Sequence, residues 1–284
     1  MLQRTFLHVP TVGEKREAAL WAAGFTDWAR FLRDHPAGKF KDRVSPWLEP
    51  EAAAASLPRA HAWRLFPDYR DRILFLDIET TGLRGGEDEV TCIGTYDGRT
   101  VRAFIRGRDI EAFEEVLDAA DLLVTYNGAC FDVPFLKTAF PSLNLDRPKH
   151  IDLRYPLRRL GFRGGLKRIE PQLGVTRNES VAGVDGYMAV LLWHEHLRGH
   201  PRALDTLVRY CLEDVVNLEP LLIETFNRMT DGLPIAVPRL PAVPAPEIPW
   251  TADTDLVRDI LSRSAIGAGI ASDETSFSSP WKRQ

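Results

Sequence analysis

The sequence predicts an α/β protein whose mixed sheet has helices on its faces. Three apolar segments with the character of strands precede the first clear helix, and a fourth follows it. The turn signal YDGRT makes two consecutive segments antiparallel neighbours. The fourth segment follows a crossover helix, so we expect it to lie parallel to the first. The strand segments are 73–78, 89–96, 100–105 and 121–126, and the helical ones are 110–119, 165–173, 184–198 and 202–229.

The bulk composition is that of a globular protein. The chain has 284 residues, of which 44% are hydrophobic and 27% charged, so it can bury a substantial core. A formal net charge of -4 argues against a uniformly basic coat protein but leaves room for a local basic groove. Three cysteines without a CxxC pair favour a reducing compartment. No segment approaches the ~20 apolar residues of a membrane span, and the first residues lack an apolar signal core. We expect a soluble, cytoplasmic protein.

Composition divides the chain into four regions. Residues 1–34 contain a Pro-x-x-Gly turn and two short helical patterns, which indicate a helical hairpin. Residues 35–69 form a proline-containing connector. Residues 70–231 hold the complete α/β pattern. Residues 232–284 begin with a proline-rich segment and end in a polar stretch, and we expect them to form a disordered tail.

Two carboxylates stand at the end of the first strand, in the stretch FLDIETTGL. Asp77 and Glu79 are two residues apart, so their side chains point to the same face of the sheet. Thr80, Thr81 and Gly82 follow, and the glycine lets the backbone approach a ligand closely. Two ionised carboxylates beside an apolar core are costly, which indicates a functional reason. The alternative, that these acids cap a neighbouring helix, is equally compatible with this stretch alone.

Two further motifs carry acids or a tyrosine. Asp132 lies in the first turn of a helix that follows the strand at 121–126, where it could also serve the helix dipole. Tyr210 and Asp214 are four residues apart and share one face of a late helix. A structural alternative for this pair is a hydrogen bond between hydroxyl and carboxylate in the core.

The three motifs together indicate metal-dependent chemistry. Four carboxylates converging at the carboxyl end of a sheet would repel one another unless cations neutralised them. Oxygen ligands without cysteine or histidine favour Mg²⁺ or Mn²⁺. Two such ions ~3.5–4 Å apart would clamp a phosphate during in-line displacement. The sequence therefore predicts phosphodiester hydrolysis with two Mg²⁺ or Mn²⁺ ions.

The motifs resemble those of the DEDD exonuclease superfamily, in the version with tyrosine in the third motif (DEDDy). The similarity lies in D-I-E at Asp77 and Glu79, the Y-N-x-x-x-F-D run ending at Asp132, and Y-x-x-x-D at Tyr210 and Asp214. It covers about residues 70–231 and implies a ribonuclease H-like mixed five-stranded sheet with helices on both faces. The phrases GLKRIEPQLG, LLWHEHLRG and YCLEDVVNL are most similar to YprB-type ribonuclease H-like proteins.

The resemblance implies a role for each of these side chains. Asp77 would bridge both metal ions, Glu79 and Asp214 would complete one site, and Asp132 would hold the second ion through water. Tyr210 would orient the attacking water or help to deprotonate it. The implied activity is a 3′–5′ exonuclease that releases mononucleotides, with DNA slightly favoured over RNA as the substrate.

A basic stretch between the second and third motifs is the predicted binding groove for single strands or 3′ ends. Residues 147–168 contain eight Lys or Arg against one acid, Asp152, with aromatic residues interleaved. The alternative is a solvated helix face. We expect contacts to nucleic acid from Thr80, Thr81, Asn127, Arg158, Arg159, Arg163, Lys167 and Arg168.

The N-terminal stretch VPTVGEKREAAL resembles a helix-hairpin-helix motif, whose turn offers backbone N–H groups to a phosphate. Thr11 stands where that motif normally has its first glycine, so a purely structural hairpin is as compatible with this stretch. Two other functions remain open. One is a structure-guided endonuclease or flap-trimming enzyme, and the other is a binding module that uses the fold without turnover. Nothing in the sequence indicates a protein partner.

Overall fold

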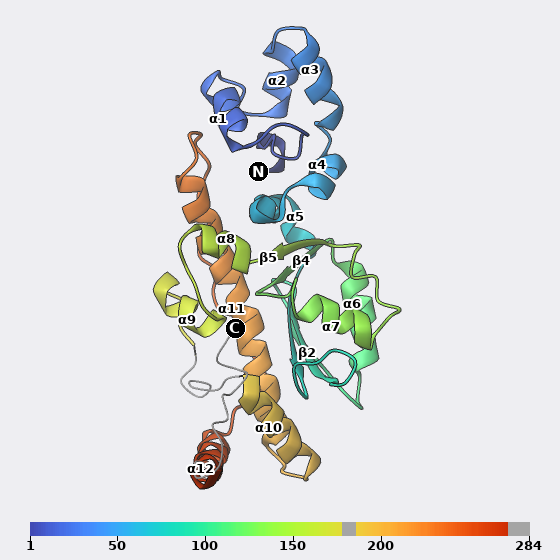
Figure 1. The fold of residues 1–284 in the computed structure, drawn as a ribbon, viewed down its shortest axis with the longest axis vertical. Coiled ribbons are helices and arrows are strands. Elements are labelled where there is room, and N and C mark those ends of the chain that lie inside the picture. The colour runs from blue at the N-terminus through green and yellow to red at the C-terminus, as the bar shows by residue number, and fades with distance from the viewer. Residues whose placement is uncertain (178–185, 272–284) are drawn as a thin grey trace.

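The computed structural model describes residues 1–177 and 186–271, with side chains as far as residue 263. Within these residues the chain forms a five-stranded sheet of order β3-β2-β1-β4-β5 (Figure 1). β1 pairs antiparallel with β2 and parallel with β4, while β3 adds an antiparallel edge and β5 a parallel one. The predicted mixed five-stranded α/β sheet is therefore confirmed. The strands are β1 (Ile73–Thr80), β2 (Val90–Tyr96), β3 (Val101–Ile105), β4 (Leu122–Thr125) and β5 (Lys149–Asp152).

Helices cover both faces of this sheet (Figure 1). Successive side chains of a strand point to opposite faces, so Leu74 and Leu76 of β1 pack in one hydrophobic cluster with α6 and α7. Phe75 lies in another cluster, together with residues of α11. Asp77 and Glu79 share the parity of Phe75, so they project on the face covered by α10 and α11. The four helices are α6 (Phe113–Ala119), α7 (Asp132–Ala139), α10 (Gly186–Leu197) and α11 (Ala203–Asp231).

The helical predictions for this region hold in outline. α11 spans the predicted helix at 202–229, and its apolar positions are buried against the sheet. α10 corresponds to the prediction at 184–198, of which residues 184 and 185 lie outside the described part of the chain. The predicted helix at 165–173 is divided into α9 (Leu166–Ile169) and a 3-10 turn, because Pro171 cannot donate a backbone hydrogen bond.

The first residues form a helical hairpin of α1 (Glu14–Ala22) and α2 (Trp28–Asp34), joined through Gly24, whose φ is 92°. Thr11 has a φ of 73°, in the left-handed region that glycine favours. The turn before α1 therefore has the backbone conformation of a glycine turn although a threonine occupies it. Whether this turn binds phosphate stays a prediction.

The N-terminal hairpin, the connector and the sheet share one hydrophobic core. A single cluster of buried side chains includes Phe31 of α2, Trp63 of the connector and Phe226 of α11. The rings of Trp63 and Phe226 meet edge to face with centroids 5.6 Å apart. The connector is folded rather than extended, and it contains α3 (Lys39–Val44), α4 (Pro50–Ser56), a 3-10 helix (Arg59–Leu65) and α5 (Phe66–Tyr69). The domain boundaries themselves stay a prediction.

A buried ion pair connects the hairpin to the connector. The guanidinium of Arg64 contacts both carboxylate oxygens of Glu17 at 2.9 Å, and each side chain is only 2% exposed. Glu17 also accepts hydrogen bonds from the hydroxyl of Thr5 and the backbone N–H of Phe6. Every oxygen of this carboxylate therefore has a donor, which is the condition under which a buried charge is tolerated.

The prediction of a disordered tail after residue 231 is wrong for residues 233–263. Leu240 is held against α11 by Asn227, whose side chain accepts from its backbone N–H at 2.8 Å and donates to its carbonyl at 3.0 Å. Farther on, α12 (Thr254–Ala271) buries Leu256, Val257 and Ile260 against α10 and α11. These apolar positions give the tail enough buried surface to fold. Residues 272–284 lie outside the described part.

None of the helices in the described ranges is both long enough and apolar enough to cross a membrane.

Replacing Glu17 with glutamine is expected to lower the free energy of unfolding by about 3–5 kcal/mol, because Arg64 would stay buried without its counter-charge. Urea denaturation followed by tryptophan fluorescence measures this loss. The control is Glu87→Gln, which breaks the exposed pair between Arg84 and Glu87 and should cost less than about 1 kcal/mol. Equal losses in the two variants would contradict a structural role for the buried pair.

Candidate active site

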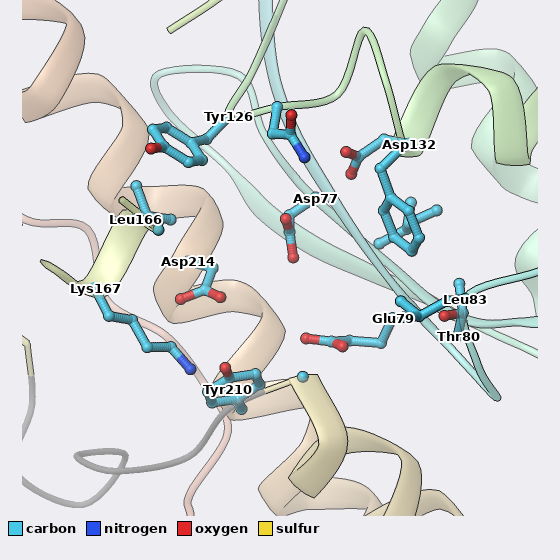
Figure 2. Close-up of a pocket in the computed structure, with 15 residues that line it drawn as sticks. Asp77, Glu79, Thr80, Leu83, Tyr126, Asp132, Leu166, Lys167, Tyr210 and Asp214 are labelled. Atoms are coloured by element: carbon cyan, nitrogen blue, oxygen red, sulfur yellow. The ribbon is translucent and has the colours of Figure 1, made fainter. Parts of the chain in front are cut away.

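A pocket of about 300 Å³ lies at the carboxyl end of β1. Its lining includes all five residues that the sequence predicted as catalytic: Asp77, Glu79, Asp132, Tyr210 and Asp214. Figure 2 shows the four carboxylates turned toward the same space, with Tyr126 at one rim and Lys167 beside Tyr210 at the other. These residues come from three separate segments of the chain, and the fold brings them together.

The pocket exists because β1 is longer than its parallel neighbour. β4 pairs with β1 only along Ile73–Phe75 and ends at Thr125. Beyond Phe75, β1 continues with β2 as its partner, up to a register shift after Glu79. Asp77 and Glu79 therefore project past the end of β4, where the sheet has an opening. Ligands of open α/β sheets bind at such carboxyl edges.

Asp132 reaches the pocket from the opposite face of the sheet. It is the first residue of α7, so its charge can also interact favourably with the positive end of the helix dipole. The residue is 3% exposed, and its Oδ1 atom has no hydrogen-bond partner. The pKa of the Asp132 carboxyl is raised to about 7, chiefly by burial and also by the charge of Asp152, while hydrogen bonds from backbone N–H groups oppose this shift. A buried, unpartnered carboxylate oxygen in this position fits a cation.

Tyr210 and Asp214 face the pocket because they lie one turn apart on α11. Tyr210 is 2% exposed, and the Nζ atom of Lys167 lies 4.1 Å from the centroid of its ring. Asp214 is 9% exposed and points into the space between Lys167 and Glu79 (Figure 2). The helix therefore presents a phenol and a carboxylate to the two acids of β1.

Burial and mutual repulsion both oppose ionisation of the acids in the pocket. Burial raises the pKa of Asp77 well above its ordinary value, and the charges of Asp132, Asp214 and Glu79 raise it further. Burial also raises the pKa of Glu79, followed by the charge of Asp214. The positive charge of Lys167 lowers both pKa values but does not outweigh these effects. The cluster therefore needs more positive charge than this lysine supplies if all four acids are to be ionised.

Arg177 supplies a second positive charge, and the sequence analysis missed it. Its guanidinium forms ion pairs with Asp214 and with Glu170. Glu170 is fully buried, and it also accepts a 3.0 Å hydrogen bond from Asn217 of α11. Burial lowers the pKa of Arg177, but the two carboxylates raise it by more, so the guanidinium stays charged. An isolated arginine between two motifs carries no pattern that could have revealed this contact.

The donor set fits a divalent cation with oxygen ligands. Ligand atoms of Asp77, Glu79 and Cys211 all lie within 4.8 Å of one another. The Cys211 thiol is buried, with its pKa raised by the nearby Cys92 thiol and by burial, so it stays protonated. A protonated thiol is a poor ligand, and the carboxylates are the donors that Mg²⁺ and Mn²⁺ prefer. The acidic cluster therefore has the chemistry that these ions require.

The other predicted contacts divide between the pocket and its surroundings. Thr80, Asn127 and Lys167 line the pocket. Thr81 does not line it, because its hydroxyl bonds Asp88 at 3.3 Å and accepts from the backbone N–H of Glu89 at 2.9 Å.

The predicted arginines lie outside the pocket. Arg158 and Arg163 line a neighbouring cleft, while Arg168 is exposed beside Gly164. Arg159 is bound to Glu14 of α1 at 2.8 Å, so its guanidinium braces the fold.

Asp152 holds the loop that leads to Asp132. Its carboxylate accepts hydrogen bonds from the backbone N–H groups of Asn127 at 2.8 Å, Ala129 at 3.1 Å and Arg154 at 3.0 Å. Asn127 has a φ of 67°, so the chain turns sharply there before α7 begins. Asp152 thus serves the start of α8 (Arg154–Arg159) and also fixes the approach to the pocket.

A mixed five-stranded sheet with an acidic pocket at the end of its central strand is consistent with a ribonuclease H-like fold. A family model for the RNase H superfamily matches residues 74–225, more than half of the chain, and the chain belongs to this superfamily. It is also similar to the uncharacterized protein YprB of Bacillus subtilis (strain 168), with 30% identity over 182 residues. That alignment covers 56% of this chain and 43% of YprB, so the chain spans less than half of this relative.

Several solved structures are similar at low TM-scores. The family B DNA polymerase of Pyrobaculum calidifontis has a TM-score of 0.43 and 24% identity, over 52% of this chain and 24% of that one. Brucella melitensis NrnC bound to pGG has a TM-score of 0.41 and 16% identity, over 77% of this chain and 94% of that one. Escherichia coli RNase D, an exoribonuclease involved in structured RNA processing, has a TM-score of 0.39 and 21% identity. The match covers 64% of this chain and 44% of that one. TM-scores below 0.5 support no conclusion about the activity of this chain.

The metal-free protein is expected to lose stability as the pH rises from about 4 to about 7. Below this window the Asp132 carboxyl is protonated in both the folded and the unfolded protein. Within the window mainly the unfolded protein releases the proton, and above it both forms release it. The free energy of unfolding is expected to fall by up to about 4 kcal/mol across this window. Denaturation in EDTA across this pH range measures it.

Asp132→Asn is expected to remove the part of that pH dependence that Asp132 contributes and to leave the part due to Asp77 and Glu79, whose pKa values are also raised. Asp118→Asn, an exposed acid on α6, should leave the profile unchanged. An unaltered pH profile in Asp132→Asn would contradict the raised pKa.

Proposed function

We propose that the protein is a metal-dependent 3′–5′ exonuclease of the DEDDy type, which hydrolyses phosphodiester bonds with two Mg²⁺ or Mn²⁺ ions. The observation that carries this proposal is the convergence of Asp77, Glu79, Asp132 and Asp214, with Tyr210, in one pocket. Structural acids would be expected to have hydrogen-bond partners, whereas Asp132 has a buried oxygen without one. The family membership supports nuclease chemistry, and DNA is slightly favoured over RNA as the substrate.

Each side chain has a role in this mechanism. Asp77, Glu79 and Asp214 would hold one ion, with Asp77 also serving the second ion together with Asp132. The bound ions lower the pKa of water and neutralise charge on the phosphate oxygens. Tyr210 orients the attacking water through its hydroxyl and helps to remove its proton. Thr80, at the end of β1, lies where the terminal sugar would rest.

Two features of the pocket suit the terminal nucleotide of a strand. The pocket is bounded by Tyr126 and Phe131, whose rings offer surfaces for a base. Its volume of about 300 Å³ is at the lower end for ligand pockets and is too small for a folded duplex end. A frayed or single-stranded 3′ end is therefore the expected substrate.

The first test is a cleavage assay with 5′-labelled single- and double-stranded DNA and RNA in Mg²⁺ or Mn²⁺. The wild-type protein is expected to give a ladder of strands shortened from the 3′ end. Asp77→Ala should abolish it because a ligand of both ions is lost, whereas Asp118→Ala, an exposed acid on α6, should retain it.

Internal cuts in circular substrates would instead support the endonuclease alternative. Binding without cleavage in either metal would contradict both enzymatic functions and support the binding module.

The second test separates metal binding from proton transfer. Tyr210→Phe is expected to lower kcat by about 10²-fold with unchanged Mn²⁺ affinity, because the ring stays while the hydroxyl is lost. Asp214→Asn should abolish activity and weaken Mn²⁺ binding, because it removes a ligand charge. Isothermal titration calorimetry with Mn²⁺, alongside the kinetics, distinguishes the two. Equal losses of metal affinity would contradict the role of Tyr210.

A further inference from the structure

A second, smaller cleft adjoins the acidic pocket. It has a volume of about 210 Å³ and is lined by Tyr126, Arg154, Arg158, Arg163 and Gly164. Tyr126 also lines the acidic pocket, so this one side chain separates the two spaces. The cleft therefore lies next to the active-site pocket, on the side of Tyr126.

The cleft is a built feature of the fold. Arg154 and Arg158 are one turn apart on α8, so they share a face of that helix. The hydroxyl of Tyr126 donates to the carbonyl of Gly164, which holds the following loop against the ring. Gly164 has a φ of 118°, and a Cβ atom there would lie 2.8 Å from the side chain of Arg168, so the loop requires glycine. Arg154 is fixed in turn by a hydrogen bond to the side chain of Asn127.

The three arginines are not neutralised. Among residues 1–177 and 186–263, none of them lies within ion-pair distance of a carboxylate. Other cations of the same basic stretch do have partners: Arg159 is paired with Glu14, and Arg147 with Asp121. Arg158 and Arg163 are exposed, so their charges face solvent at the cleft. An unpaired cluster of arginines suits an anion that several guanidinium groups can bind together.

The position of the cleft identifies the anion. Beyond the pocket a strand carries further negative charges, which positive charge nearby can hold. A 3′-terminal nucleotide in the pocket would extend past Tyr126, and the strand would meet the arginines next. We propose that this cleft binds one backbone phosphate of the substrate strand, on the 5′ side of the bond that is cut. This assignment rests on the proposed exonuclease function.

The two sources of such a phosphate differ in chemistry only slightly. It is an internal phosphodiester when the strand is long, and a terminal 5′-phosphate when the substrate is a very short oligonucleotide. Both present anionic oxygens to the same guanidinium groups. Arg158 and Arg163 are exposed, so the cleft can be reached from solvent and the longer strand is compatible with it.

The test is an equilibrium binding assay with fluorescent single-stranded oligonucleotides, in the Asp77→Ala background so that no cleavage occurs. Arg158→Gln and Arg163→Gln are each expected to weaken binding roughly tenfold, since each loses a charge-assisted contact. The double variant should also lower the salt dependence by about 0.7 in log K against log salt, the value for one phosphate of a single strand. Arg30→Gln, an exposed charge on α2, is the matched control and should change neither.

Neutral methylphosphonate linkages then locate the phosphate. One linkage at a time is replaced, starting from the 3′ end. A neutral linkage at the bound position should weaken binding to the protein that keeps both arginines. The same linkage should have no further effect on binding to the double variant. Short oligonucleotides with and without a 5′-phosphate form the second arm. If the arginine substitutions weaken the binding only of oligonucleotides that carry a 5′-phosphate, the ligand is a terminal phosphate.

The failure of this assignment is distinguishable from failure of the proposed function. If the wild-type protein shortens strands and the arginine variants bind like the Arg30→Gln control, the phosphate cleft is wrong while the exonuclease stands. If binding depends on the arginines but no metal supports cleavage, the cleft stands and the exonuclease is wrong. Absence of nucleic-acid binding in every variant would overturn both. Thermal unfolding of each variant, and recovery of binding by Arg158→Lys, exclude a loss of folding as the cause.

Discussion

The crowding of four carboxylates in one pocket is the constraint on which the rest of this structure depends. Side chains that resist ionisation at close range must be held from several directions, since each one would otherwise turn toward water. β1 fixes two of them, α7 a third and α11 the fourth. Lys167 and Arg177 reduce the repulsion without removing it. The long α11, the early end of β4 and the hydrogen bonds made by Asp152 are all understandable as means of keeping these acids in place.

Local periodicity was sufficient to predict much of this arrangement. Alternation along a strand places Asp77 and Glu79 on one face, and helical spacing places Tyr210 and Asp214 together. Both rules depend only on neighbouring residues. The hairpin signal predicts the antiparallel pairing of β2 with β3, and the crossover rule predicts that β4 is parallel to β1, whereas neither rule places β5. The five predicted catalytic residues therefore lie together in the structure, although their chemical roles stay proposals.

What the sequence did not reveal depends on contacts between distant segments. Arg158 and Arg159 are neighbours in one basic run, yet one faces a cleft and the other is bound to Glu14. Both residues are arginines, so the sequence cannot distinguish them. Only the position of Glu14 of α1 beside Arg159 gives them different surroundings. Arg177 is a similar case, because its partners are distant in sequence or on another helix. The order of the tail was missed because prolines suggest extension, whereas burial is decided by what the apolar residues between them can reach.

The folded tail also bears on how the catalytic helix is supported. Leu256, Val257 and Ile260 of α12 lie in the same cluster as Tyr210 and Cys211, and Asp253 anchors α12 by accepting from its first N–H groups and pairing with Arg202. A chain shortened at Asp231 would keep every acid of the pocket and yet expose an apolar groove along α10 and α11. Proteolysis in the segment before α12 would thus expose apolar side chains of α10 and α11 to solvent. The helix that carries Tyr210 would also lose its contacts with α12. The buried apolar core therefore continues past the prolines that follow α11 and into α12.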